Sequence, residues 1–175
     1  MLDLNAEAPA FALDGVVNGA VRRVTLAEFR GRWLVLFFYP ADWSFVCPTE
    51  VVGFERRLGD LTRLGAAVVG VSVDDVESHR AWAAELGGVT YPLLADPTRA
   101  VCRAYGVLNE AEGRAYRATI VVSPEGRIAY QVVSPMNVGR SVEETVRVLE
   151  ALRSGKLCPA DWKPGDPTLD ARAGD

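Results

Sequence analysis

The sequence predicts a single α/β domain built on a central mixed sheet that is flanked by helices. Two stretches, Trp33–Tyr39 and Ala67–Val73, are almost entirely apolar and have the length of strands buried on both faces. Each is followed by a stretch of helical length with one apolar face. A chain of 175 residues with 49% hydrophobic side chains is also large enough to bury one substantial core.

The N-terminal region predicts a β-hairpin followed by a short helix. Phe11–Val17 and Ala20–Val24 have strand composition and flank Asn18-Gly19, the strongest two-residue hairpin signal. Thr25-Leu26-Ala27-Glu28 then has the pattern of a capping box, which opens a helix.

Two helices are predicted after the buried strands. The first begins near Pro48, because proline is favoured at the first helical position. Its apolar residues fall on one face: Val51, Phe54, Leu58 and Leu61. Asp74 or Asp75 caps the second helix, which runs through His79 to Gly87-Gly88. A short strand at Tyr91–Ala95 and a short helix at Pro97–Tyr105 follow.

The last third of the chain predicts a second hairpin, a helix and an arm. Ala118–Ser123 and Arg127–Val133 flank a Pro-Glu-Gly turn. A second capping box at Ser141–Glu144 opens a helix that runs to Arg153 and stops at Gly155. We therefore expect a domain over residues 1–157 and an extended C-terminal arm over residues 158–175, which is rich in proline.

The composition argues against nucleic acid and membranes as partners. The net charge is −4, with no basic footprint for nucleic acid. The longest apolar run, Trp33–Tyr39, is far too short to cross a bilayer as a helix. The N-terminus lacks a basic segment followed by an apolar one, so the sequence predicts a cytoplasmic protein.

The cysteines favour thiol chemistry over a structural role. The chain has three cysteines, too few and too far apart for a disulfide scaffold. Cys47 and Cys158 are each followed by proline. With one histidine and no Cys-x-x-Cys pair, a zinc site lacks ligands, and we expect neither a metal nor a cofactor.

Cys47 stands where a buried strand has ended and a helix begins. A helix N-terminus carries unpaired N–H groups and a partial positive charge, and both stabilise a thiolate. Glu50 lies in the same turn, where a carboxylate can orient a nearby cation. Ser44 stands three residues before Cys47 and can place a hydroxyl beside the sulfur.

The segment from Pro40 to Glu50 resembles the active-site loop of the peroxiredoxins, most closely that of the typical two-cysteine subgroup that includes alkyl hydroperoxide reductase C. Pro40, Ser44 and Cys47 fill the family pattern of proline, hydroxyl residue and cysteine. Arg117 occupies the place of the family's active-site arginine, and Gly155–Gly165 is similar to its resolving-cysteine segment. The resemblance spans nearly the whole chain and implies a thioredoxin-like fold.

The resemblance implies a thiol peroxidase that reduces hydrogen peroxide and organic hydroperoxides. Cys47 attacks the peroxide, Ser44 and the backbone N–H of Cys47 bind its oxygens, and Arg117 stabilises the thiolate and the breaking bond. Pro40 shields the site from water, while Glu50 holds the arginine in place.

The resemblance also assigns Cys158 a role and implies partners. Cys158 of a second subunit condenses with the Cys47 sulfenic acid to give an intersubunit disulfide. A thioredoxin-like or flavoprotein disulfide reductase then restores the thiols. The expected assembly is a homodimer, with a ring of five dimers as a family expectation, and no bound cofactor is needed.

Two residues are left outside the predicted site. Cys102 lies in a short helix where a small apolar side chain would pack, and His79 has the position of a helix-packing or interface residue. The family's peroxide-sensitive members carry a Gly-Gly-Leu-Gly loop and a Tyr-Phe pair after the resolving cysteine, which this sequence lacks. We therefore expect disulfide formation to outrun over-oxidation of Cys47.

Three alternatives compete with the two-cysteine peroxidase. In a one-cysteine peroxidase an external thiol resolves the sulfenic acid, and Cys158 argues against it. A thioredoxin-type oxidoreductase needs the missing Cys-x-x-Cys pair. An oligomeric, redox-switched holdase remains open, because such a role can coexist with peroxidase activity.

Overall fold

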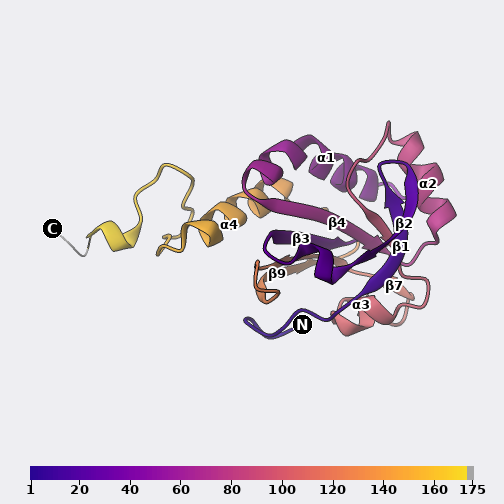
Figure 1. Ribbon diagram of the computed structural model, residues 1–175, viewed down its shortest axis with the longest axis horizontal. Coiled ribbons are helices and arrows are strands. Elements are labelled where there is room, and N and C mark those ends of the chain that lie inside the picture. Colours follow the sequence, from indigo (N-terminus) through magenta and orange to yellow (C-terminus); the bar gives the residue numbers. More distant parts are fainter. Residues whose placement is uncertain (173–175) are drawn as a thin grey trace. The chain divides into compact units, whose positions relative to one another are not determined.

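The computed structural model describes residues 1–172 of the chain (Figure 1). Backbone contacts divide the chain into two compact units, Met1–Arg140 and a smaller one that begins at Ser141. Each unit is considered by itself below.

A seven-stranded mixed sheet forms the centre of the first unit. Its strands lie in the order β2, β1, β5, β4, β3, β8 and β9. Strands β3, β4 and β5 are mutually parallel neighbours, while the remaining pairs are antiparallel. The bounds are β1 Ala12–Val17, β2 Ala20–Thr25, β3 Trp33–Phe38, β4 Ala66–Ser72, β5 Leu93–Ala95, β8 Arg117–Val122 and β9 Ile128–Ser134.

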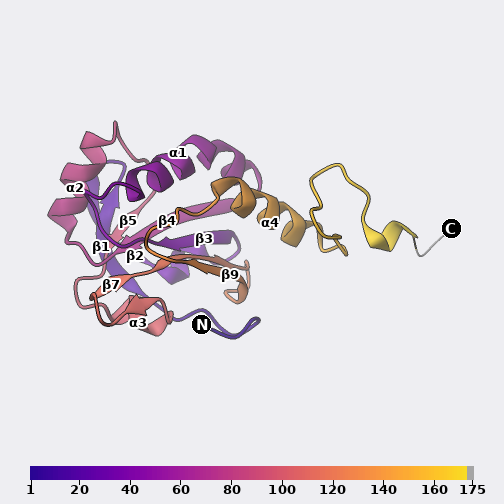
Figure 2. The same cartoon turned by 180° about the vertical axis from the view of Figure 1, so that it is seen from behind.

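Helices cover both faces of this sheet. They are α1 (Cys47–Arg63), α2 (Val76–Glu85) and α3 (Ala100–Ala104), with a short 3₁₀ helix η1 at Leu26–Phe29. Figures 1 and 2 show α1 on one side of the sheet and α3 on the other. Helix α1 packs on β4, and α2 packs on β1 and β5. The predicted α/β architecture is therefore confirmed.

The two hairpins predicted from turn residues are both present. Asn18 and Gly19 join β1 to β2 with φ values of 48° and 82°, the left-handed region that an Asn-Gly turn tolerates. The backbone N–H of Thr25 donates to Glu28 Oε1 at 3.0 Å, as the capping pattern predicted. The second hairpin joins β8 to β9.

The two central apolar stretches form strands that are covered on both faces. β3 lies between β4 and β8, and every residue from Leu34 to Phe38 is buried. β4 is equally covered along most of its length. A strand with neighbours on both edges and helices on both faces has no solvent side for a polar residue.

Four elements differ from the prediction. Helix α3 begins at Ala100 rather than Pro97, because Arg99 has a left-handed φ of 64° that no helix can include. β5 begins only at Leu93, after Pro92, which has no N–H to give to a ladder. Strands β6 (Leu108–Asn109) and β7 (Arg114–Ala115) were not predicted, since two residues carry no periodicity.

The second unit contains α4 (Val142–Ser154) and the segment that follows it. Ser141 Oγ accepts from the N–H of Glu144 at 3.0 Å, and Gly155 ends the helix with a left-handed φ of 63°. The arm beyond is not fully extended. It folds into turns and a 3₁₀ helix, η2 (Leu169–Arg172), and the N–H of Leu169 donates to the carbonyl of Leu157 at 2.8 Å.

Two further observations concern the described part of the chain. No helix within residues 1–172 is both long and apolar enough to span a bilayer. In the same residues, no group of at least three His, Cys, Asp or Glu side chains could hold a metal ion.

Two glycines with different surroundings should respond oppositely to substitution by alanine. A Cβ on Gly15 would lie 2.5 Å from both the carbonyl oxygen of Leu93 and Cδ2 of Leu94, whereas a Cβ on Gly59, within α1, meets nothing within 4 Å. Gly15→Ala should lower the free energy of unfolding by about 2 kcal/mol. Gly59→Ala should raise it by about 0.5–1 kcal/mol. Urea unfolding measures both, and a loss of stability in Gly59→Ala equal to that in Gly15→Ala would contradict the contact.

Candidate active site

Cys47 is the first residue of α1, and its side chain is 0% exposed. The chain leaves β3 at Phe38 and reaches the helix after eight residues of loop, 39–46. Pro48 stands in the first turn, where its missing N–H costs no helical bond. The sulfur therefore lies at the positive end of a helix of 17 residues, in a site closed to solvent.

Arg117, the first residue of β8, joins Cys47 to Glu50. Its Nη1 lies 3.2 Å from Cys47 Sγ and 2.9 Å from Glu50 Oε2. Its Nε donates to the backbone carbonyl of Met136 at 2.8 Å, which fixes the plane of the guanidinium. Arg117 is 4% exposed and Glu50 is 2% exposed, so solvent screens this pair little.

Arg140 is a second arginine at this carboxylate, and sequence reasoning missed it. Its backbone N–H donates to Glu50 Oε1 at 3.0 Å, and Nη2 lies 3.3 Å from Oε2. Its Nη1 donates to the carbonyl of Ala118 at 2.7 Å, and the guanidinium carbon lies 5.2 Å from the centre of the Phe37 ring. Burial lowers the pKa of Arg140, and the Glu50 carboxylate opposes that shift.

The buried charges beside Cys47 do not balance one another. Two buried guanidiniums, Arg117 and Arg140, face a single carboxylate, Glu50. The two guanidiniums and the carboxylate together carry one net positive charge. A buried charge without a partner is costly. Cys47 Sγ, 3.2 Å from Arg117 Nη1, lies beside this excess of positive charge.

The structure places the other two predicted loop residues less closely. Pro40 is buried, two residues after the end of β3. Ser44 is half-buried, and its Oγ donates to the carbonyl of Ala41 at 3.1 Å rather than to the sulfur. Cys47, Glu50 and Arg117 are thus brought together, whereas the Ser44 hydroxyl closes a turn of the loop.

Asp42 anchors the loop, and the sequence did not single it out. Its Oδ1 accepts from the Tyr39 hydroxyl at 2.8 Å, and its Oδ2 lies 2.8 Å from Ser78 Oγ and 2.7 Å from His79 Nδ1. His79 Nε2 lies 2.9 Å from the carbonyl of Leu94, which can only accept, so Nε2 carries a proton. We call these four side chains, Tyr39, Asp42, Ser78 and His79, the loop anchor.

The remaining two cysteines lie in different surroundings. Cys158 belongs to the second unit, is half-buried, and has its Sγ 3.6 Å from Ser154 Oγ. Cys102 is 0% exposed within the core cluster. Burial raises the pKa of the Cys102 thiol far above its usual range, with the Asp96 carboxylate adding to the shift. This confirms the interpretation of Cys102 as a packing residue.

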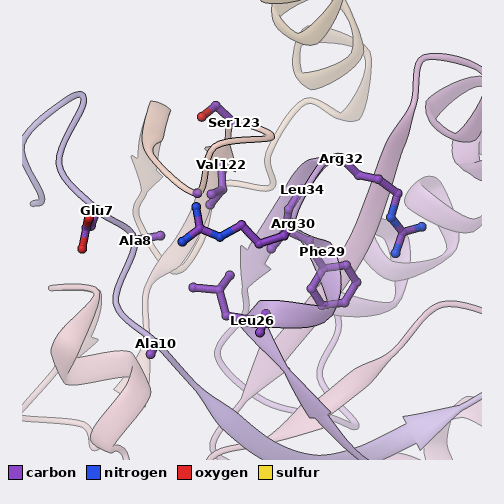
Figure 3. Close-up of a pocket in the computed structure, with 12 residues that line it drawn as sticks. Glu7, Ala8, Ala10, Leu26, Phe29, Arg30, Arg32, Leu34, Val122 and Ser123 are labelled. Carbon is purple, nitrogen blue, oxygen red and sulfur yellow. The ribbon is translucent and has the colours of Figure 1, made fainter.

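A cavity of about 230 Å³ lies at the other end of β3 from Cys47. Its apolar lining includes Leu26, Phe29, Leu34 and Val122, and Figure 3 shows Arg30 reaching toward Val122 and Ser123. The strand rises roughly 3.3 Å per residue, so the length of β3 separates this cavity from the thiol. No cysteine lines it, and it takes no part in the site described above.

Comparison with known proteins identifies the family to which the chain belongs. Residues 4–131 match the model of the AhpC/TSA family. The chain belongs to the AhpC/TSA family of peroxiredoxins. Residues 151–172 match a second model, described as the C-terminal domain of 1-Cys peroxiredoxin. In this peroxiredoxin that second segment carries Cys158.

Relatives and solved structures agree along almost the whole chain. It is 45% identical to a putative peroxiredoxin, YkuU, of Bacillus subtilis (strain 168), over 93% of this chain and 96% of that protein. It is 42% identical to peroxiredoxin-2 of Cricetulus griseus, over 96% of this chain and 90% of that protein.

Among solved structures, Enterococcus faecalis AhpC superposes with a TM-score of 0.86 at 41% identity, covering 91% of this chain and 100% of that one. The reduced 2-Cys peroxiredoxin of Plasmodium vivax gives a TM-score of 0.89 at 30% identity, covering 96% and 93%. The predicted thioredoxin-like fold is confirmed, and the chain is an enzyme of the typical two-cysteine, AhpC-like type.

The loop anchor predicts that Asp42→Asn destabilises this peroxiredoxin. An asparagine would turn an N–H₂ group toward the Tyr39 and Ser78 hydroxyls or toward His79, and it would remove the charge that faces a buried imidazole. Losing one partner of a buried pair costs about 3 kcal/mol.

Asp14→Asn is the matched control, because Asp14 pairs with Arg23 on the exposed hairpin. It should change the free energy of unfolding by less than about 1 kcal/mol. Equal effects of the two variants in urea unfolding would contradict the role given to Asp42.

Proposed function

We propose that Cys47 is the peroxide-attacking thiolate of this enzyme and that Arg117 activates it. The observation that supports this most directly is the position of Arg117 Nη1, within 3.2 Å of Sγ and 2.9 Å of Glu50 Oε2. One always-protonated group thus touches the nucleophile while a buried carboxylate holds it there.

In the first step the Cys47 thiolate attacks one oxygen of the hydroperoxide. A sulfur–oxygen bond forms, the O–O bond breaks, and the other oxygen leaves as alkoxide or hydroxide and takes up a proton. The sulfur is oxidised to sulfenic acid and the peroxide is reduced to an alcohol or water. Arg117 stabilises the charge as it moves from sulfur to the leaving oxygen.

Pro40 and Ser44 have supporting roles in this proposal. Pro40 is buried, and in this proposal it keeps water from the sulfur. The Ser44 hydroxyl, now 3.1 Å from the carbonyl of Ala41, would turn to the peroxide when substrate enters. The backbone N–H of Cys47 is the second donor to the peroxide oxygens.

In the second step the Cys158 thiol of a partner subunit attacks the Cys47 sulfenic acid. A disulfide forms and water leaves, so the two thiols have together supplied two electrons. Disulfide geometry requires Cα atoms about 4.4–6.8 Å apart. Because Cys47 is 0% exposed, the first turn of α1 must unwind before another chain can reach its sulfur.

The oxidised enzyme is then reset by thiol–disulfide exchange. A peroxide substrate and a disulfide reductase follow from membership of the family. We propose a thioredoxin-like protein or a flavoprotein as that reductase, since either can present a reactive dithiol. A cytoplasmic location fits this cycle, because the cytosol keeps the thiols of such reductases reduced.

The assembly in this proposal is a homodimer, extended to a ring of five dimers. The active-site loop supports contacts between dimers, since Phe45 is 100% exposed and Trp43 is 58% exposed. Neighbouring large apolar side chains on a surface mark an interaction site. The loop anchor holds Asp42, beside Trp43, in a fixed place and so presents this surface.

A one-cysteine peroxidase is the second candidate. The match of residues 151–172 to the C-terminal domain of 1-Cys peroxiredoxin favours it. The same segment contains Cys158, however, and a thiol in the matched segment supports resolution by the protein itself. The fate of Cys158 therefore separates the two mechanisms.

We predict that one equivalent of hydrogen peroxide converts the reduced protein to a disulfide-linked dimer. On a non-reducing denaturing gel, the band at twice the monomer mass should be absent from both Cys47→Ser and Cys158→Ser. Cys102→Ser, the matched control at a buried thiol, should form the dimer as the wild type does. A stable sulfenic acid at Cys47 without a dimer band would support the one-cysteine mechanism instead.

We also predict that Arg117→Lys slows the reaction of Cys47 with hydrogen peroxide by about 100-fold. Lysine keeps the charge but loses the planar fork that reaches Sγ, Glu50 and the Met136 carbonyl together. Stopped-flow measurement of peroxide consumption gives the rate constant. Arg23→Lys, at an exposed pair, should react as the wild type does, and an unchanged rate in Arg117→Lys would remove Arg117 from the mechanism.

A further inference from the structure

The cavity at the far end of β3 from Cys47 lies where three segments of the first unit meet (Figure 3). These are the N-terminal residues 7–10, the helix η1 with the residues that follow it, and the turn between β8 and β9. None of the residues that surround Cys47 lines the cavity. It is therefore available for a role of its own.

We propose that this cavity binds a medium-chain monocarboxylate, with the alkyl chain inside the cavity and the carboxylate at Arg30. The proposal assigns a second, non-catalytic site to the protein. It goes beyond the proposed function, because it uses neither Cys47 nor Cys158.

The inner part of the cavity is apolar. Phe29, Leu34 and Val122 line it, and all three are buried members of the main hydrophobic core cluster. Leu26 also lines the cavity and packs against the same cluster. A hydrocarbon chain in this space would be removed from water on all sides, which favours binding in proportion to the apolar area covered.

Arg30 places a positive charge beside this apolar space with no carboxylate to neutralise it. Its Nη1 donates to the backbone carbonyl of Glu125. The guanidinium also lies against Gly126, where an added Cβ would come within 3.1 Å of Nη1. The Nε and Nη2 groups of Arg30 have no partner within residues 1–172. Their N–H groups can therefore donate to a carboxylate, the anion whose planar geometry a guanidinium matches.

The other charged residues of the lining leave the cavity with a net positive charge. Arg32 also lines it, with its guanidinium carbon 5.5 Å from the centre of the Phe29 ring. Glu7 carries the only negative charge of the lining, and Figure 3 shows it on the opposite side of the N-terminal segment from Arg30. Neither arginine forms an ion pair in the part of the chain that the structure describes. Two positive charges and one negative charge favour an anion over a cation.

Backbone hydrogen bonds hold the walls of the cavity in place. The N–H of Ala8 donates to the carbonyl of Gly126 at 2.9 Å, which joins the N-terminal segment to the turn between β8 and β9. The N–H of Gly31 donates to the carbonyl of Pro124 at 2.9 Å, which joins the end of η1 to the same turn. A ligand would therefore enter a preformed site and would not need to order a loop.

The volume of the cavity sets the length of the alkyl chain. A dry apolar cavity of about 150 Å³ holds benzene, which has six carbon atoms. On that scale the 230 Å³ of this cavity accommodates roughly nine carbon atoms. Octanoate, with eight, is the probe that fits this space and keeps its carboxylate at Arg30.

The test measures binding of octanoate, hexanoate and 1-octanol to the reduced full-length protein by isothermal titration calorimetry. We expect one site per chain. Octanoate should bind about 15-fold more tightly than hexanoate, because it buries two more methylene groups. 1-Octanol has the same chain without the charge and should bind at least about five-fold more weakly than octanoate. Absence of saturable octanoate binding, or equal affinity for 1-octanol, would overturn the inference.

Two variants with matched controls locate the site. Arg30→Gln should weaken octanoate binding by about ten-fold and leave 1-octanol unaffected, whereas Arg23→Gln, at an exposed pair on the hairpin, should change neither. Ala8→Leu, which fills the cavity beside Arg30, should weaken both ligands, whereas Ala20→Leu on the exposed hairpin should weaken neither. Equal octanoate affinities in Arg30→Gln and Arg23→Gln, or in Ala8→Leu and Ala20→Leu, would place the ligand elsewhere and refute the proposal. Arg30→Gln should consume peroxide at the wild-type rate, and a slower rate would contradict the separation of the two sites.

Discussion

The active site depends on the burial of one carboxylate, that of Glu50. Two guanidiniums reach it from positions 67 and 90 residues further along the chain, Arg117 at the start of β8 and Arg140 at the end of the first unit. None of these three charges is stable in this position without the others, because each would be left unpaired in a region closed to water. Their mutual requirement fixes the plane of Arg117, and that plane is what turns one N–H group toward the sulfur of Cys47.

The chain on the two sides of Cys47 is restrained to different degrees. Before Cys47, the loop anchor fixes Asp42 through side chains from the end of β3 and from α2. After it, Arg117 and Arg140 bind Glu50, and the hydroxyl of Tyr91 donates to the backbone carbonyl of Val51. The loop before Cys47 is therefore held through several side chains, whereas the start of α1 after it is held through one carboxylate and one backbone carbonyl.

Local patterns in the sequence predicted the parts of the fold that local physics determines. The Asn-Gly hairpin, the doubly buried β3 and the start of α1 beside Pro48 all depend on neighbours in the chain. Arg140 and Asp42 could not be found in this way, since Glu50 lies 90 residues from Arg140 and His79 lies 37 residues from Asp42. Arg117 was placed by family resemblance, and only the folded sheet brings it to Cys47. Ser44 shows that a matching motif does not fix a hydrogen bond. It stands three residues before Cys47 as the family pattern requires, but its hydroxyl donates to the carbonyl of Ala41 and not to the sulfur.

The strand order also affects how the protein is made. β3 obtains its second neighbour, β8, only after about eighty more residues have been added to the growing chain, and the N-terminal hairpin must wait for β5. At about 5–20 residues per second, several seconds of synthesis pass with Leu34–Phe38, apolar on both faces, exposed along one edge. Nascent chains on neighbouring ribosomes of one messenger RNA therefore expose the same apolar, unpaired strand at the same time. This makes the rate of translation, and the holding of unfinished chains by chaperones, part of what determines the yield of this enzyme.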